Sequence, residues 1–241
     1  EAGALPSQWS APRPTIVLVH GAFADATGWQ ELIPILQRLG YPMIAVQNGL
    51  TSVSADIATT RRVIDAQPGE VILVGHSYGG VAISGAASGS PKVKALVYVA
   101  AYAPDATESL SDLNAKFPAT PLVNAIKPDV AGFVYIDAEK YREVFAQDVP
   151  MPATRVMAVT QKPANFATLI DPLGVPAAWR SIPSWYIVAQ QDRTINPDLE
   201  RFLAKRMGAT TTELATSHVP FISRPEQVAK VIFAAAESVS P

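Results

Sequence analysis

A serine that could act as a nucleophile lies between glycines at position 77. The apolar run Val71–Val74 leads directly into the pattern Gly-x-Ser-x-Gly at residues 75–79, and a helical stretch follows. Glycines at these places permit a sharp turn from a strand to a helix, which raises the serine hydroxyl above the edge of a sheet. Backbone N–H groups at the start of the helix favour negative charge there. We interpret Ser77 as a nucleophile; the alternative is a serine that only caps the helix.

A serine hydroxyl needs a base that removes its proton, and the chain contains three histidines. His20 ends the first apolar run. His76 directly precedes Ser77, so its side chain is expected to point away from the hydroxyl. By elimination the base is His218, which lies in a loop after the last expected strand. Without Ser77, this residue would be interpreted as an ordinary loop histidine.

The histidine in turn needs a carboxylate that holds its tautomer and stabilises the imidazolium. Asp192 directly follows the apolar run Ser184–Ala189, at the carboxyl end of an expected strand, where open α/β sheets place their sites. Asp198 and Glu200 are rivals, but both fall on the next expected helix and should be solvated. The alternative role for Asp192 is that of a turn residue.

The tetrahedral intermediate of acyl transfer also requires two N–H donors for its oxyanion. One is expected from Tyr78, the residue after the nucleophile, and the other from the loop His20–Phe23 after the first strand. In that loop Ala22 is the preferred donor and Phe23 the second choice. The side chain of Phe23 is also a candidate pocket wall.

Buried strands and helices alternate along two parts of the chain, residues 15–103 and 184–241. Nearly continuous apolar runs indicate strands that are buried on both faces. These runs are Thr15–Val19, Pro42–Val46, Val71–Val74 and Val93–Val99, and the alternation resumes with strands expected at Ser184–Ala189 and Thr210–Leu214. Helices are expected near residues 29–39, 54–66, 80–87, 198–207 and 225–239. The pattern predicts an α/β fold with a mostly parallel, twisted sheet flanked by helices.

The alternation stops between residues 104 and 183, a span rich in proline with short helical pieces such as Ser109–Lys116 and Ala138–Gln147. We interpret this span as a small helical lid or cap inserted into the core. Its aromatic residues are candidates to line a substrate pocket. The predicted substrate-binding residues are Phe23, Phe133, Tyr135, Trp179 and Val219.

Composition excludes several other classes of protein. The 241 residues are 49% hydrophobic and carry a formal net charge of −2 without a cluster of Lys and Arg, which argues against disorder and nucleic-acid binding. No run is long enough to span a membrane. Cysteine is absent and the histidines are scattered, so neither a metal nor any other cofactor is expected.

Residues 1–14 are expected to form an irregular lead-in, typical of either a cytoplasmic or an exported, processed protein. Oligomeric state stays open.

Taken together, the motifs resemble those of the α/β-hydrolase superfamily across residues 15–239. The matching elements are Val19-His20-Gly21, the Ser77 motif, Asp192 after a strand and His218-Val219-Pro220, in the chain order serine, aspartate, histidine. Within the superfamily, the chain is similar to small bacterial carboxylesterases and to the plant methylesterase and hydroxynitrile lyase branch.

This resemblance implies a serine carboxylesterase acting through an acyl-enzyme on small, neutral, largely apolar carboxylic esters or lactones. A hydroxynitrile lyase is one alternative, but such lyases carry threonine where Gly21 stands and lysine where Val219 stands. The other alternative is a non-catalytic binder of small molecules on the same fold.

Overall fold

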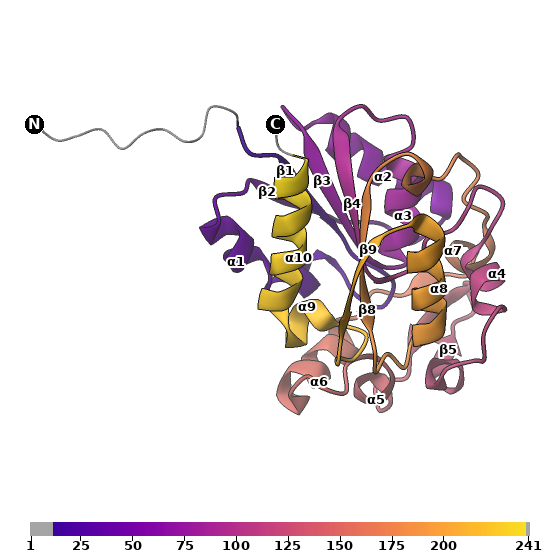
Figure 1. Ribbon diagram of the computed structural model, residues 1–241. Coiled ribbons are helices and arrows are strands. Elements are labelled where there is room, and N and C mark those ends of the chain that lie inside the picture. The colour runs from indigo at the N-terminus through magenta and orange to yellow at the C-terminus, as the bar shows by residue number, and fades with distance from the viewer. Residues whose placement is uncertain (1–11, 240–241) are drawn as a thin grey trace, which may run out of the picture.

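A computed structural model describes residues 12–239 (Figure 1). The expected lead-in, residues 1–14, lies outside the described residues except for positions 12–14. No helix within the described range has the length and apolar character required to cross a membrane.

Six parallel strands form the central sheet, in the order β2-β1-β3-β4-β8-β9. They are β1 (Thr15–Val19), β2 (Met43–Val46), β3 (Val71–Ser77), β4 (Val93–Ala101), β8 (Ser184–Ala189) and β9 (Thr210–Leu214). The four inner strands are almost completely buried because their apolar side chains pack against helices on both faces. The predicted parallel sheet is confirmed.

Helices cover both faces of the sheet (Figure 1). One face carries α1 (Ile33–Arg38) and α10 (Pro225–Ser238), and the other carries α2 (Val53–Asp65), α3 (Gly79–Ala86) and α8 (Pro197–Met207). Local signals fix their ends: Ser52 caps α2, and Gly208 ends α8 in the left-handed conformation with φ 63°. Two shorter elements, the 3-10 helix η1 (Ala26–Trp29) and α9 (Pro220–Ser223), lie in loops after β1 and β9.

Residues 104–183 contain more structure than the sequence predicted. The elements are α4 (Leu110–Asn114), η2 (Pro121–Asn124), β5 (Ile126–Pro128), β6 (Phe133–Ile136), α5 (Tyr141–Phe145), α6 (Met151–Thr160), β7 (Ala164–Asn165), α7 (Ala167–Ile170) and η3 (Ala178–Arg180). The antiparallel sheet β5-β6-β7 was not predicted, nor was α6. These strands have only two to four residues, and even the apolar β6 alternates between buried and more exposed side chains, so the pattern is too short to indicate a strand.

This inserted segment packs against the loops at the carboxyl ends of the central strands. The Tyr141 hydroxyl donates to the Phe23 carbonyl after β1 at 2.8 Å. The Gln147 amide donates to the Gln191 carbonyl after β8 at 2.7 Å, and Asp148 accepts from the N–H of Ser217 after β9 at 3.0 Å. Residues 104–183 therefore contact the loops at the edge of the sheet where the sequence placed the site.

Candidate active site

Ser77 lies at the turn between β3 and α3, with a φ of 54° that is uncommon for a residue with a side chain. Its side chain retains 6% exposure. The turn is possible because Gly79 and Gly80 lack side chains: a Cβ on Gly79 would overlap the Val19 carbonyl, and one on Gly80 would overlap the Tyr102 carbonyl. Close backbone packing therefore forces the strand to turn and presents Ser77 at its end.

His218 and Asp192, from loops after neighbouring strands β9 and β8, form a buried pair. The Nδ1–H of His218 donates to Oδ2 of Asp192 at 2.7 Å. The other oxygen, Oδ1, accepts from the N–H groups of Thr194 at 2.7 Å and Ile195 at 2.9 Å. These donors hold the carboxylate in place, and the carboxylate places the proton of the ring on Nδ1. The Nε2 atom of His218 is left as an acceptor.

Among described residues, Nε2 of His218 has no hydrogen-bond partner, and it makes no hydrogen bond to the Ser77 hydroxyl in this structure. The ring of His218 lies 4.5 Å, centroid to centroid, from that of His76, the residue before Ser77. An unpaired base nitrogen beside the turn is typical of a resting site, where the bond to the nucleophile tightens only when substrate binds.

His76 has a role that the sequence did not reveal. Its Nε2–H donates to the His218 carbonyl at 2.8 Å. Burial lowers the pKa of His76 well below its usual value, so the ring stays neutral. The bond joins residues 142 positions apart and holds the loop of the base against β3, which no local pattern could indicate.

The expected oxyanion donors gather at the same turn. A Cβ on Gly21 would lie 2.8 Å from the Ser77 Cβ and 3.2 Å from the Tyr78 nitrogen, so the loop after β1 lies directly against the nucleophile. The N–H of Phe23 already donates to the Lys162 carbonyl at 3.0 Å. For Ala22 and Tyr78, no N–H partner occurs within the part of the chain that the structure describes. The arrangement favours Ala22 over Phe23 as the donor.

The side chain of Tyr78 is anchored from the neighbouring helix. Its hydroxyl donates to the buried Asp56 of α2 at 2.8 Å, and Asp56 also accepts from the Leu50 N–H at 3.1 Å. Burial raises the pKa of Tyr78, and the nearby Asp56 carboxylate raises it further, so the phenol stays neutral. The sequence indicated a role only for the Tyr78 backbone, because an Asp–Tyr pair 22 residues apart has no sequence signature.

The expectation for the rival carboxylates was half wrong. Asp198 is exposed and pairs with Arg201 at 2.9 Å, but Glu200 is fully buried. Glu200 lies on the inner face of α8, so the first turn of the helix turns it toward β8 while Asp198 faces solvent. Burial, and after it the nearby charge of Asp192, raise the pKa of Glu200.

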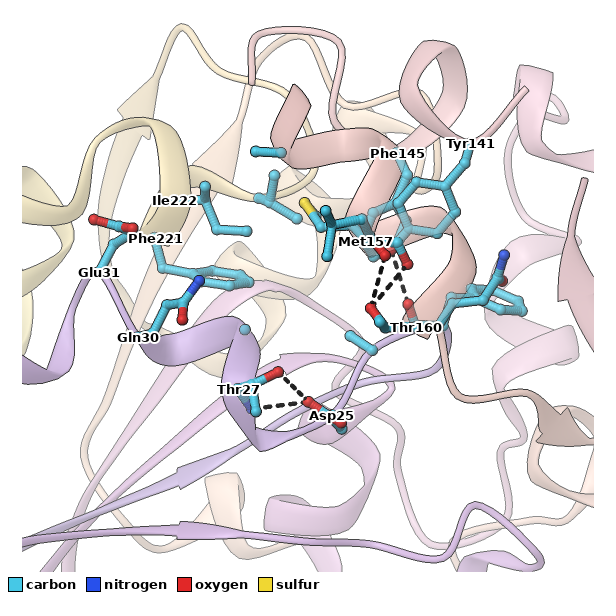
Figure 2. A pocket seen from close by; sticks show the side chains of 17 residues that line it. Asp25, Thr27, Gln30, Glu31, Tyr141, Phe145, Met157, Thr160, Phe221 and Ile222 are labelled. Atoms are coloured by element: carbon cyan, nitrogen blue, oxygen red, sulfur yellow. Dashed lines mark hydrogen bonds between the residues drawn. The ribbon is translucent and has the colours of Figure 1, made fainter. Parts of the chain in front are cut away.

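A cavity of about 310 Å³ adjoins the site (Figure 2). Phe23 and Val219 line it, together with Phe145, Met157 and Phe221. Phe145 also contacts the His218 ring, with centroids 5.0 Å apart. Ser77 and His218 are not among its lining residues, so the cavity lies beside the nucleophile rather than directly over it.

Three predicted substrate-binding residues do not line this cavity. Phe133 and Tyr135 lie on the small sheet strand β6, where Tyr135 is 37% exposed. Trp179 is buried and donates from Nε1 to the Pro104 carbonyl at 2.9 Å. In place of these three, α6 supplies Met157 and α5 supplies Tyr141 and Phe145. Over residues 12–239, no cluster of three or more His, Cys, Asp or Glu could hold a metal ion.

Known proteins share both sequence and fold with this chain. The model of the alpha/beta hydrolase family matches residues 16–231. A pyrethroid hydrolase of Sphingobium wenxiniae is 31% identical over 90% of this chain and 85% of its own length, and methylesterase 8 of Arabidopsis thaliana is 24% identical over 93% and 90%. The crystal structure of a pyrethroid hydrolase from Sphingobium faniae superposes with a TM-score of 0.79 at 24% identity, covering 93% of this chain and 98% of that one. The chain belongs to the alpha/beta hydrolase family.

Proposed function

We propose that this protein is a serine carboxylesterase that hydrolyses small, neutral, largely apolar carboxylic esters or lactones through an acyl-enzyme. The observation that carries the proposal is the His218–Asp192 pair, bonded at 2.7 Å, with the second ring nitrogen unpaired beside the Ser77 turn. Relatives named methylesterase and pyrethroid hydrolase fit an enzyme of this class.

In the proposed mechanism Nε2 of His218 takes the proton from the Ser77 hydroxyl, and Oγ attacks the ester carbonyl carbon. The N–H groups of Ala22 and Tyr78 stabilise the oxyanion. The imidazolium, stabilised by Asp192, then gives its proton to the departing alcohol, which leaves an acyl-enzyme. Water, deprotonated by Nε2, attacks the acyl carbon; the bond to Oγ then breaks, the acid leaves, and the imidazolium returns its proton to Ser77 Oγ. Every proton transfer uses residues of this chain, and no cofactor takes part.

The cavity beside the site supports the proposed substrate class. Its walls are mostly apolar, so it favours the hydrocarbon part of an ester. Asp25 and Glu31 are among its lining residues (Figure 2) and would repel a substrate with a free carboxylate. In the proposed function, residues 104–183 act as a lid, whose helices α5 and α6 form the wall of this cavity opposite Phe221.

Val219 and Gly21 argue against the lyase alternative. A lyase of this type needs a hydroxyl and a cation near the nucleophile, and these two positions supply neither. We therefore advance no second function.

The main test is substitution of the nucleophile. Ser77→Ala is expected to lower kcat on an aryl acetate about 10⁴-fold or more with an unchanged melting temperature, because the remaining groups have no atom to acylate. An organophosphonate should label the parent protein once, at Ser77, and leave S77A unlabelled. Ser111→Ala, at an exposed serine of α4, is the matched control and should keep full activity. Near-parental activity of S77A would refute the proposal.

A substitution in the cavity wall tests the proposed substrate class. Met157→Trp narrows it and should raise KM for bulky aromatic esters while leaving acetate esters nearly unchanged. Val159→Trp, on the same helix but 78% exposed and outside the cavity, is the control. Equal effects of the two variants on every ester would exclude this cavity as a substrate site.

A further inference from the structure

A buried glutamate lies behind the acid–base pair. Glu200, in the first turn of α8, has no solvent exposure. Its Oε1 accepts from the N–H of Ala189, the last residue of β8, at 3.0 Å. Its Oε2 is also buried and receives no hydrogen bond from any described residue. A carboxylate with one donor and no cation is costly to bury, so this group needs another explanation than simple packing.

The carboxyl group of Asp192 lies close to Glu200, because both residues bond to Ala189 at the end of β8: Glu200 accepts from its N–H, and the Asp192 N–H donates to its carbonyl at 3.2 Å. Two ionised carboxylates would repel each other there, and they can bond only if one carries a proton. Asp192 accepts three hydrogen bonds, from His218, Thr194 and Ile195, whereas Glu200 accepts one. The donors favour charge on Asp192, so the proton belongs on Glu200.

The surroundings point to the same assignment. Burial, and after it the Asp192 charge, raise the pKa of Glu200 well above its usual value of 4.5. Tyr186 of β8 and Tyr102 after β4 also face the two carboxyls, and burial raises the pKa of both phenols, so they stay neutral. Their hydroxyls are engaged elsewhere, that of Tyr186 with the Ala101 carbonyl and that of Tyr102 with Asn114.

The remaining charged groups do not neutralise Glu200. Arg201, the next residue on α8, is directed outward to Asp198 and Glu213. Asp148, from the insertion, binds the Ser217 N–H, and His76, from β3, is neutral. The only group of the cluster that gains positive charge is His218 itself, when it accepts the serine proton.

We propose that Glu200 is a positioning residue, protonated in the working enzyme, that donates a hydrogen bond from its carboxyl to Asp192. The inference rests on the proposed esterase mechanism for its effect on rate, but the protonation of Glu200 can be tested without activity. With Glu200 neutral, the pair behind His218 carries one negative charge instead of two, and Asp192 is fixed on both sides. No proton moves to or from Glu200 during turnover.

The first test compares melting temperature against pH for the parent and Glu200→Gln, which keeps the shape and can donate to Asp192. A glutamate with a raised pKa in the folded state stabilises fully below its unfolded pKa, near 4.5, and this stabilisation is lost as pH rises. The melting temperature of the parent should therefore fall relative to that of E200Q as pH rises above 4.5. Glu226→Gln, at an exposed glutamate of α10, should follow the parent. Parallel curves for the parent and E200Q would overturn the protonation of Glu200.

The second test is the pH profile of kcat/KM on an aryl acetate. E200Q should keep kcat/KM and the midpoint of its acidic limb, because a neutral donor replaces a neutral donor. Glu200→Leu, which keeps bulk but lacks the donor, should lose about tenfold in kcat with little change in KM, the effect of one hydrogen bond to a charged group. If Glu200 were ionised, E200Q would remove a negative charge near the imidazolium and move the acidic limb to lower pH.

The outcomes separate the two proposals. A parent protein without activity on any ester would refute the esterase function, whereas the melting curves would still decide the protonation of Glu200. If E200L does not fold, E200Q alone decides. Either a shifted acidic limb of its kcat/KM profile or a curve of melting temperature against pH that runs parallel to that of the parent would contradict the inference.

Discussion

The nucleophile turn and the acid–base pair serve one proposed reaction but are held in place by different means. At the turn, Ser77 is presented by backbone geometry, because glycines allow β3 and α3 to pack against the neighbouring strands. The pair of His218 and Asp192 is held by hydrogen bonds among buried ionisable groups, with Glu200 and His76 behind it. The turn should therefore respond to added volume, and the pair to charge and pH.

The largest effect is expected from a change of charge at constant volume. Asp192→Asn should lower kcat about 10⁴-fold, because an amide can donate to Nδ1 and favour the wrong tautomer of His218. The measurement is kcat on an aryl acetate, with Asp198→Asn as the control, since Asp198 is exposed. A loss no greater than that of D198N would mean that the pair does not depend on charge.

An added methyl group at the turn should chiefly affect folding. Gly79→Ala places a Cβ against the Val19 and His20 carbonyl oxygens, and rigid backbone on both sides cannot yield. We expect a loss of about 3 kcal/mol or more in the free energy of unfolding, measured by urea denaturation. Gly69→Ala is the control, because nothing lies within 4 Å of its Cβ. Similar free energies of unfolding for the two variants would mean that close backbone packing does not hold the turn in place.

The Tyr78–Asp56 bond tests whether the turn also depends on a buried ionisable group. Tyr78→Phe leaves the Asp56 carboxylate without one of its donors and should cost about 1–3 kcal/mol, while the backbone N–H of residue 78 stays in place. The expected result is a lower free energy of unfolding with kcat changed only a few-fold. In a double-mutant cycle with Asp56→Ala, the two losses should not add. Strict additivity would mean that the bond contributes nothing.

The smallest effect concerns His76 and pH. Its pKa lies below the unfolded value near 6.5, so its stabilising effect is complete above that value and is lost as pH falls. His76→Gln can keep a donor for the His218 carbonyl but cannot titrate. The free energy of unfolding of the parent should fall more steeply than that of H76Q between about pH 6.5 and 5.5, by up to about 1.4 kcal/mol per pH unit. His20, also buried, is present in both proteins, so the difference isolates His76. Equal slopes would contradict the expectation.

Most of the core could be predicted because its signals are local. The bounds of β1, β8 and β9 match the expected strands residue for residue. In β1 and β8 the signal is an apolar run, since strands buried on both faces must be largely apolar. The small sheet β5-β6-β7 could not be predicted, because its short strands are stabilised by their partners and by the core beneath them. Met157 was likewise absent from the predicted pocket, because a cavity wall depends on how distant segments meet.

The sequence by itself determined the parallel sheet, the Ser77 turn and the order of the serine, aspartate and histidine, because apolar runs and glycine positions act through neighbouring residues. Only the tertiary structure decided the state of the polar groups around them. In the folded chain the Phe23 N–H donates to the Lys162 carbonyl, and Glu200 is buried near Asp192. Whether a donor is free or a carboxylate is solvated depends on atoms contributed from far along the chain, and burial then sets the energy of each charge.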